Sequence, residues 1–382
     1  MKQRNLLRRM TALMLCLCLL CAGADAVTLA DGTVVWGYSE GMALAEKDGK
    51  WGYANAAKQI VIPIQYDSAV SFNLGIAAVN KDGKLGVIRQ DGKYLIQPVY
   101  DALLPVDCGL YIAQKGAKWG VVSILSFPDG VGGKTNLLYP LEYDSVQVEE
   151  QAGSQVLSLL QGDKRTVVPL FQLPALLKER GVPSAAFPLN RGRLPAFTDV
   201  SPRDWFDLWV DIAYNVGLTS GVGNNRYGPE QTLTVAEALK LAATMDSRYK
   251  DDDFHLQTTP SGSKWYRLAV DYCLASGIIK SGQFQESDYT RAVTRGEMAG
   301  ILAATTLAKE IPLINSLDQI KLRVPDVTLR TPNAAAIYSL YAKGILTGVD
   351  SSLTFRPDAT LTRAEMAAIV SRMARAEQRL TL

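Results

Sequence analysis

Histidine is almost absent from the sequence: His255 is the only one in 382 residues, in the polar stretch Asp-Asp-Asp-Phe-His-Leu-Gln. One imidazole cannot form a zinc-binding histidine cluster and gives no basis for a Ser-His-Asp triad. The glycine patterns of nucleotide-binding loops are missing. Asp251, Asp252 and Asp253 lack the glycine and distal glutamate of a calcium loop. We therefore expect no catalytic residue, no metal and no cofactor.

Cysteine is also scarce, and three of the five cysteines, Cys16, Cys18 and Cys21, lie near the N-terminus. Cys108 and Cys273 fall in different regions, so we expect each to be an unpaired, small apolar core residue. An exported chain without a disulfide framework is more typical of a bacterial surface than of animal secretion.

Long apolar runs are confined to the N-terminus, and no other run approaches the length that spans a bilayer. Residues 1–26 combine basic side chains, an apolar run and small residues, which predicts a secretory signal cleaved after Ala24 or Ala26. A lipoprotein reading of Cys21 is the alternative, although Leu20 stands where a small residue is expected. The signal holds four basic and one acidic residue, so its removal after Ala26 changes the net charge from +2 to −1. A chain with this net charge is not strongly basic, so we expect no nucleic-acid partner.

The region 27–170 has an internal period of 34 residues. The triplets that begin at Lys50, Lys84 and Lys118 are 34 apart, as are Tyr66-Asp67 and Tyr100-Asp101. Tyr143-Asp144 follows after 43, which places an insertion at residues 126–134. A fixed period of this size indicates a repeat architecture.

Each unit of this region reads as a short antiparallel meander. Apolar runs over 76–79, 85–88 and 94–97 are separated by Asp82-Gly83 and Asp91-Gly92, a strong hairpin signal. Units this small must stack to bury a face. The stretches KDGKWGYAN, KDGKLGVIR and GAKWGVVS resemble the WG-containing β-repeat family, which implies a β-rich repeat without a shared enzymatic activity. Leu85 replaces the tryptophan in one copy, which favours core packing over an exposed binding platform.

Residues 171–196 contain four prolines and are expected to form a linker. A helix is predicted over 173–180, because Gly181 and Pro183 follow it. The remainder is typical of an extended, semi-rigid spacer.

A second repeat occupies the region 197–382. Three Thr-x-x-Glu motifs, Thr234/Glu237, Thr294/Glu297 and Thr362/Glu365, stand 60 and 68 residues apart. Each is a capping box, in which threonine and glutamate satisfy backbone N–H groups at a helix start. Arg295 and Arg363 follow the threonine in two copies, and a cation there is disfavoured by the helix dipole unless an anion is near. We expect these guanidinium groups to be exposed and to need a partner outside the fold.

Each copy also predicts an earlier helix that ends at Gly217, Gly277 or Gly344 before an apolar residue, which is typical of a Schellman stop. In the first copy the periodicity places Trp205, Trp209 and Val216 on one apolar stripe.

The repeat resembles the S-layer homology domain in its short motifs and in their order along the chain. These motifs are Asp-Val, Trp-Phe or Trp-Tyr, Gly-Ile, Phe-x-Pro-Asp and Thr-Arg-Ala-Glu. The resemblance covers 197–250, 251–310 and 311–382 as a triplet. It implies three units around a pseudo-threefold axis that attach a protein non-covalently to a cell-wall polysaccharide, often one with acidic pyruvyl groups. The fold class expected for the whole chain is therefore multi-domain α+β, with an all-β repeat followed by a mainly helical three-repeat domain.

Four residues are candidates for contact with such a polymer: Arg295, Arg363, Trp205 and Trp265. A helix start with an adjacent arginine suits a carboxylate, and an aromatic ring suits a sugar face. The structural alternatives are a surface salt bridge for the arginines and core packing for the tryptophans. Val235 replaces the arginine in the first copy, so we expect a weaker groove there.

The sequence thus predicts a secreted, non-enzymatic bacterial surface protein anchored to a secondary cell-wall polysaccharide or a peptidoglycan-linked polymer. Its β-repeats would form a displayed module with an unknown ligand. Two alternatives stay open: a wall-anchored hydrolase with its active site in the β-repeats, and a self-assembling surface-array protein.

Overall fold

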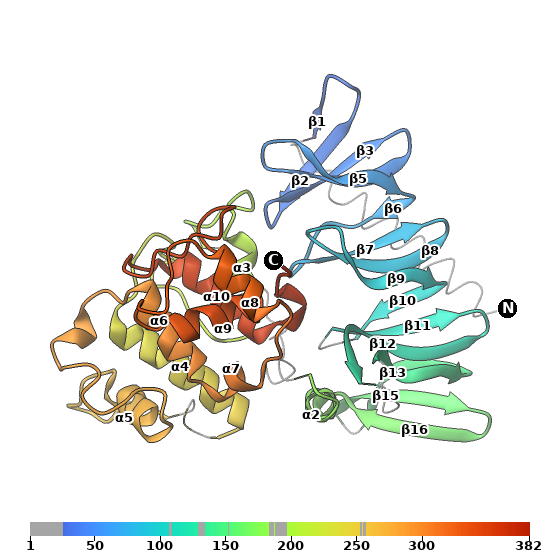
Figure 1. Cartoon of the computed structure of the whole chain (residues 1–382). Coiled ribbons are helices and arrows are strands. Elements are labelled where there is room, and N and C mark those ends of the chain that lie inside the picture. The colour runs from blue at the N-terminus through green and yellow to red at the C-terminus, as the bar shows by residue number, and fades with distance from the viewer. Residues whose placement is uncertain are drawn as a thin grey trace. The chain divides into compact units, whose positions relative to one another are not determined.

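The computed structural model describes residues 26–106, 109–128, 134–151, 153–182, 187, 197–252, 254 and 257–382. The expected signal up to Asp25, Cys108, His255 and most of the linker after Val182 lie outside these residues. The chain divides into two compact units. The strand unit comprises most of the chain up to Val167 together with Ser201–Leu208. The helical unit comprises Val168–Val200 and Trp209–Leu382, and Phe127–Lys134 clusters with it (Figure 1).

Among the residues that the structure describes, the strand unit contains four antiparallel sheets, each made of consecutive strands: β1–β5, β6–β9, β10–β13 and β14–β16. This confirms the predicted meanders. The strands are β1 Val27–Thr28, β2 Val34–Ser39, β3 Met42–Lys47, β4 Lys50–Asn55, β5 Ile60–Tyr66, β6 Ser68–Ala69, β7 Ile76–Lys81, β8 Lys84–Arg89, β9 Tyr94–Tyr100, β10 Ala102–Pro105, β11 Leu110–Lys115, β12 Lys118–Pro128, β13 Lys134–Tyr143, β14 Ser145–Gln151, β15 Ser154–Gln161 and β16 Lys164–Pro169.

Tight turns set the register of the sheets. Asp82 and Gly83 have φ values of 53° and 75°, as a type I′ turn requires, and Lys81 pairs with Lys84 across it. In the other predicted turn only Gly92 has a positive φ, of 78°, and a longer loop joins β8 to β9. The insertion predicted at 126–134 includes the end of β12 and the first residue of β13, and both strands are longer than their counterparts.

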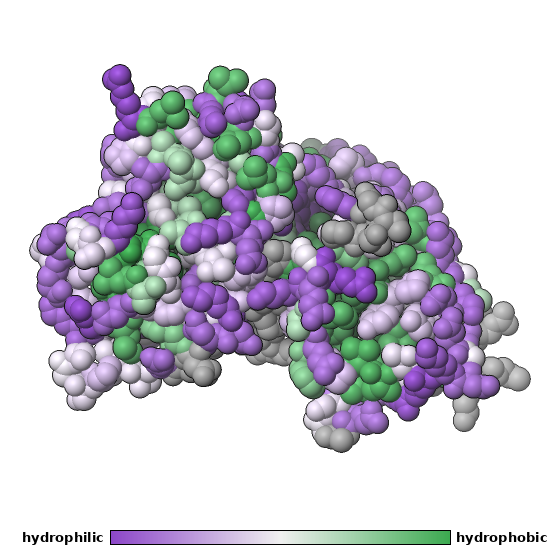
Figure 2. Space-filling view, turned by 60° about the horizontal axis from the view of Figure 1, so that its bottom comes forward, coloured by the Kyte–Doolittle hydropathy of each residue, from purple (hydrophilic) through white to green (hydrophobic). Residues whose placement is uncertain are grey.

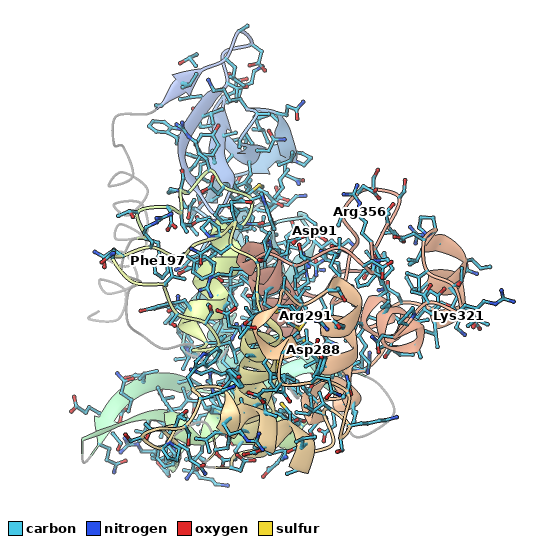
Figure 3. All side chains as sticks on the ribbon, turned by 90° about the vertical axis from the view of Figure 1, so that its left-hand side faces the viewer. Asp91, Phe197, Asp288, Arg291, Lys321 and Arg356 are labelled. Atoms are coloured by element: carbon cyan, nitrogen blue, oxygen red, sulfur yellow. The ribbon has the colours of Figure 1, made fainter. Side chains whose placement is uncertain are left out.

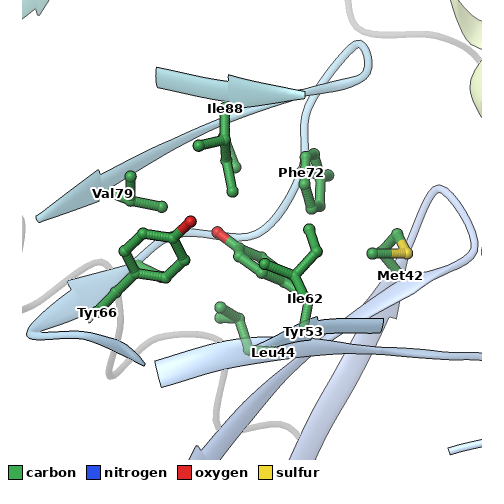
Figure 4. Packing of buried hydrophobic residues seen from close by; sticks show 10 residues of the cluster. Met42, Leu44, Tyr53, Ile62, Tyr66, Phe72, Val79 and Ile88 are labelled. Atoms are coloured by element: carbon green, nitrogen blue, oxygen red, sulfur yellow. The ribbon is translucent and has the colours of Figure 1, made fainter. Parts of the chain in front are cut away.

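Apolar side chains from neighbouring sheets form shared cores. Leu44, Tyr53 and Ile62 of the first sheet pack with Val79 and Ile88 of the second (Figure 4). A second cluster joins the second and third sheets, and Leu85 packs against it. Trp36 and Trp51 are half-buried against the first cluster. Trp36 and Trp51 therefore pack at the margin of the core that adjacent repeats share.

The glycine of the Trp-Gly pair is required by a close backbone approach. A Cβ at Gly52, Gly86 or Gly120 would lie 2.6, 2.7 or 2.7 Å from a carbonyl oxygen on the following strand. That following strand contains Pro63, Pro98 or Pro140, and β4–β5 and β8–β9 shift register beside the glycine. These are edge strands, where a proline and a bulge are tolerated and leave fewer N–H groups for further pairing.

Within the strand unit, an aspartate links each repeat to the next. One oxygen of Asp67, Asp101 and Asp144 accepts from the lysine that begins the Trp-Gly or Leu-Gly strand, at 2.5, 2.5 and 2.7 Å. The other oxygen accepts the N–H of Gly83, Gly116 or Gly162 in the next turn, at 3.0, 2.7 and 2.8 Å. These aspartate clamps explain why Lys-x-Gly, Tyr-Asp and the turn glycine recur together.

The helical unit contains η1 Leu170–Gln172, α2 Leu173–Glu179, α3 from Asp207 to Asn215 (its first two residues cluster with the strand unit), α4 Val235–Lys250, α5 Arg267–Ala275, η4 Asp288–Thr290, α6 Arg295–Ala303, α7 Thr306–Glu310, α8 Leu317–Arg323, α9 Ala334–Ala342, α10 Arg363–Ala374 and η5 Ala376–Gln378. The predicted helix after residue 172 is α2, whose Leu173 and Leu177 are buried.

The predicted glycine stops are confirmed. Gly217, Gly277 and Gly344 have φ values of 68°, 69° and 69°, in the left-handed region that favours glycine. The N–H of the apolar residue that follows each glycine donates to a carbonyl five residues earlier, at 2.9, 2.8 and 2.9 Å, which is the Schellman pattern. Cys273 is free and buried as expected, and burial raises the pKa of its thiol to about 12.

Replacing Gly86 by alanine should destabilise the strand unit by about 1–3 kcal/mol, because the added methyl group meets a fixed backbone. Gly37 is a matched control, since it also follows a tryptophan but an added Cβ would meet nothing within 4 Å. Gly37→Ala should change stability by less than about 0.5 kcal/mol. Chemical unfolding followed by tryptophan fluorescence would measure both, and equal losses would refute the close-approach explanation.

The aspartate clamps should make the strand unit sensitive to acid. The hydrogen bond from the partner lysine holds the pKa of Asp67, Asp101 and Asp144 below its usual range. Because the folded-state pKa is depressed, this stability is present above the unfolded pKa of about 3.9 and is lost as pH falls through the folded pKa. Replacing all three by asparagine should flatten the acid limb of a stability-against-pH profile, whereas Asp163→Asn, at an exposed turn, should not. An unchanged acid limb in the triple variant would contradict the assignment.

Candidate functional site

The three Thr-x-x-Glu motifs start α4, α6 and α10. The hydroxyl oxygens of Thr234, Thr294 and Thr362 each accept the N–H of the glutamate three residues later, at 3.2 Å. The carboxylates of Glu237, Glu297 and Glu365 accept the threonine N–H at 2.8, 2.9 and 2.9 Å. All three helices therefore begin with a complete capping box.

The segments that lead into these helices pair with one another. The Leu233 N–H donates to Leu361 O at 3.1 Å, the Val293 N–H to Leu233 O at 2.9 Å, and the Arg295 N–H to Ala359 O at 2.9 Å. The corresponding bridges join Thr232 with Thr362, Thr234 with Ala292, and Thr294 with Thr360. Each segment thus pairs with both others, which brings the three helix starts together.

Arg295 was expected to be exposed, and that expectation is wrong. Its side chain is 6% exposed and lies over the Phe355 ring, 5.2 Å from the ring centroid. Nε donates to Phe355 O at 2.7 Å, and Nη1 pairs with Glu365 Oε1 at 2.7 Å. A cation at a helix start is stabilised by a nearby anion, and here that anion is the Glu365 carboxylate of the next copy.

Arg363 has the same arrangement in a more open setting. It lies 4.8 Å from the Tyr227 ring centroid and donates to Tyr227 O at 2.9 Å and Ser220 O at 2.6 Å. It is only partly buried, and its bonds go to neutral carbonyls. Tyr227 and Phe355 precede the capping threonine by seven residues in their copies. Their role as supports for the arginines was missed, although the shared Tyr-x-Pro and Phe-x-Pro element was the signal for it.

The remaining helix start differs. Val235 is fully buried in the position that carries arginine in the other copies. In the second copy Arg291 lies 6.0 Å from the Phe284 ring centroid and pairs with Glu297 at 2.9 and 2.6 Å. Arg291 also pairs with Asp288 at 3.1 Å (Figure 3). An arginine from outside the motif therefore neutralises the capping glutamate here.

The Asp-Val pairs noted in the first and third copies hold the loops that carry these aromatic residues. Asp199 accepts the N–H groups of Tyr227 and Gly228 at 2.7 and 2.9 Å. Asp326 accepts those of Phe355 and Arg356 at 2.8 and 2.6 Å. Arg356 has a φ of 59°, so this contact fixes a loop with left-handed backbone. The aspartate therefore fixes the loop whose aromatic residue supports an arginine of another copy.

Trp205 and Trp265 are 59% and 49% exposed, so neither is a core residue. Each meets a buried aromatic neighbour, Phe206 or Tyr266, edge to face, at centroid distances of 5.6 and 5.5 Å. Trp205 precedes α3, contrary to its predicted place on the apolar stripe. The Lys240 amine lies 5.6 Å from the Trp265 ring centroid. Both indoles thus contact a buried ring and remain about half exposed to solvent.

Within the described ranges, no group of three or more His, Cys, Asp or Glu side chains is arranged to hold a metal ion. Asp252, from the acidic stretch, instead accepts from the Tyr272 hydroxyl at 2.9 Å and the Phe254 N–H at 3.1 Å. No helix in the described part of the chain is long and apolar enough to cross a membrane. The face in Figure 2 shows apolar patches between polar side chains.

Two protein families match parts of the chain. The WG containing repeat matches residues 33–51, 51–84 and 86–119, and the S-layer homology domain matches residues 325–367. The chain therefore carries WG repeats and an S-layer homology domain. The second match covers the third copy, with Asp326, Phe355 and Arg363, and is one domain rather than the expected triplet.

A protein described as "Cell surface protein" from Thermoanaerobacter kivui is 30% identical over 123 residues, which is 32% of this chain. The matched part spans only 14% of that relative's length. The crystal structure of HIRA(644–1017) aligns over 74% of this chain and 87% of its own, with 14% identity and a TM-score of 0.19, which is too low to indicate a shared fold.

Replacing Arg295 by alanine should destabilise the helical unit by about 2 kcal/mol, because Phe355 O and Glu365 lose a charged donor. Arg267→Ala is the control, since Arg267 and Asp271 form an exposed pair on α5 that is worth less than about 0.5 kcal/mol. Thermal or urea unfolding of the full chain measures the difference. Equal effects in the two variants would contradict the structural role of Arg295.

Proposed function

We propose that the helical unit anchors an exported bacterial protein non-covalently to a cell-wall polysaccharide. The observation that carries the proposal is Arg363, which lies half-buried at a helix start inside the segment matched by the S-layer homology domain. A relative described as a cell surface protein supports the location. The two matched families are non-catalytic types, in keeping with a role in attachment.

We further propose that the three copies act as one assembly with pseudo-threefold symmetry. The mutual pairing of the segments before α4, α6 and α10 supports this arrangement. The aromatic shelf of one copy and the arginine of another would then form a groove between copies, at Tyr227–Arg363 and at Phe355–Arg295.

The two arginines would have different roles in such a groove. Arg295 is nearly buried and already paired with Glu365, so we assign it to positioning of the neighbouring helix start. Arg363 bonds only to carbonyl oxygens among the described residues, so its charge is available to a carboxylate, such as the pyruvyl group of an acidic wall polymer. Trp205 and Trp265 would stack on sugar rings. The WG repeats would then be the displayed module.

Full-length Arg363→Ala and Trp265→Ala proteins should co-sediment with purified wall polysaccharide about 10-fold more weakly, since each loses a charged or stacking contact. Arg267→Ala controls for loss of a surface cation, and circular dichroism verifies folding. Removal of acidic groups from the polymer should weaken the wild type but add little to Arg363→Ala. Wild-type binding by both variants would refute the proposed site.

A further inference from the structure

The last sheet of the strand unit ends one strand earlier than the sheets before it. In those sheets the strand that begins with a lysine, β4, β8 or β12, pairs at its outer edge with a covering strand, β5, β9 or β13. The corresponding strand of the last sheet is β16, and β15 is its only neighbour among the strands that the structure describes. Figure 1 shows β16 at the lower end of the strand unit. The position of a covering strand is therefore open at β16.

The backbone along the outer side of β16 has no partner in the described part of the chain. Apart from the pairing with β15, no backbone hydrogen bond joins residues 164–168 to another described residue. Arg165 Nε donates to Ser158 Oγ at 2.8 Å and the guanidinium pairs with Glu149, so this side chain lies across β15 and β14 rather than along the edge. Val167 is 38% exposed. A free edge with an exposed apolar side chain is a template for an added strand.

The lysine that begins β16 lacks the partner that its counterparts have. Lys50, Lys84 and Lys118 are paired at 2.5, 2.5 and 2.7 Å with the aspartate that directly follows the covering strand. Lys164 occupies the same place in the last sheet, is exposed and forms no ion pair with any described residue. The absent strand would therefore supply a carboxylate at its end as well as an extended backbone.

Thr166 determines which kind of strand can lie beside β16. It stands where the earlier sheets have Gly52, Gly86 and Gly120, whose missing Cβ atoms leave room for a bulged, proline-containing covering strand. A Cβ at those positions would lie 2.6 or 2.7 Å from a carbonyl oxygen of that strand. The threonine side chain fills this room, so β16 excludes a bulged strand and accepts a regular one.

We propose that the outer edge of β16 binds an extended peptide segment of a partner protein, which adds to the last sheet as an antiparallel strand. The segment is regular, carries no proline opposite Val167, and ends in an acidic residue that pairs with Lys164 as Asp144 pairs with Lys118. A partner is favoured over a second copy because the strands of this chain that end before such an aspartate, β5, β9 and β13, are already paired in their own sheets. The inference does not depend on wall attachment by the helical unit.

Fluorescence anisotropy of a labelled synthetic peptide mixed with the full chain tests the edge. The probe copies Tyr94–Asp101, is amidated at its C-terminus and has threonine in place of Pro98, so it keeps the aspartate without the proline. It should bind the wild type saturably. The same peptide with Pro98 retained should bind about 10-fold more weakly, because it lacks an N–H group and favours a bulge.

Two variants of the chain locate the binding site. Val167 corresponds to Val87, which pairs with Ile96 of the covering strand, so Val167→Pro should weaken binding about 10-fold. Lys164→Gln should weaken it about 3-fold, as expected for an exposed ion pair. Asparagine in place of the peptide's aspartate should have the same effect, and the two changes together should cost no more than either alone. Lys58→Gln, which removes an exposed cation from another turn of the strand unit, is the control and should bind as the wild type does.

Absence of saturable binding to the wild type would overturn the proposal, as would wild-type affinity in Val167→Pro or independent effects of the Lys164 and aspartate changes. Equal binding of the proline-containing peptide would overturn the assignment to a regular strand. A dimer of the chain that Lys164→Gln dissociates, seen by sedimentation without any peptide binding, would replace the partner by a second copy. If circular dichroism shows that Val167→Pro does not fold, the Lys164 comparison decides. Since no wall polymer is used, failure here is distinct from failure of anchoring.

Discussion

Both repeat systems depend on a charged side chain that reaches from one copy into the next. In the strand unit, Asp67 joins the lysine of its own repeat to the turn of the following one. In the helical unit, Arg295 reaches from the second copy to Phe355 O and Glu365 of the third. A small repeat cannot bury a face alone, so its stability depends on its neighbour. Apolar packing is not directional, so we assign the alignment of one repeat with the next to these charged contacts.

This dependence changes the meaning of the Thr-Arg-Ala-Glu motif. A cation at a helix start is unfavourable in isolation. At Arg295 this cost is offset by an ion pair with Glu365 of another copy. At Arg363 the partners are neutral carbonyls. The same sequence motif therefore places its arginine beside a carboxylate in one copy and beside neutral carbonyl groups in another.

The aromatic residues divide in a similar way. Trp36 and Trp51 pack at the margin of a shared core, whereas Trp205 and Trp265 expose about half of their surface above a buried ring. Trp36 and Trp51 thus contribute to the packing of the repeats, whereas Trp205 and Trp265 remain in contact with solvent.

The sequence by itself determined the elements whose cause is local. Period and turn chemistry predicted the meanders and the turn at Asp82-Gly83. Capping signals predicted the starts of α4, α6 and α10, and glycine stops predicted the ends of α3, α5 and α9. It did not determine which residues meet. Glycine at positions 52, 86 and 120 is explained only by the backbone that crosses it, and the burial of Arg295 only by Glu365, 70 residues away. Such contacts join distant segments, and tertiary packing alone decides their partners.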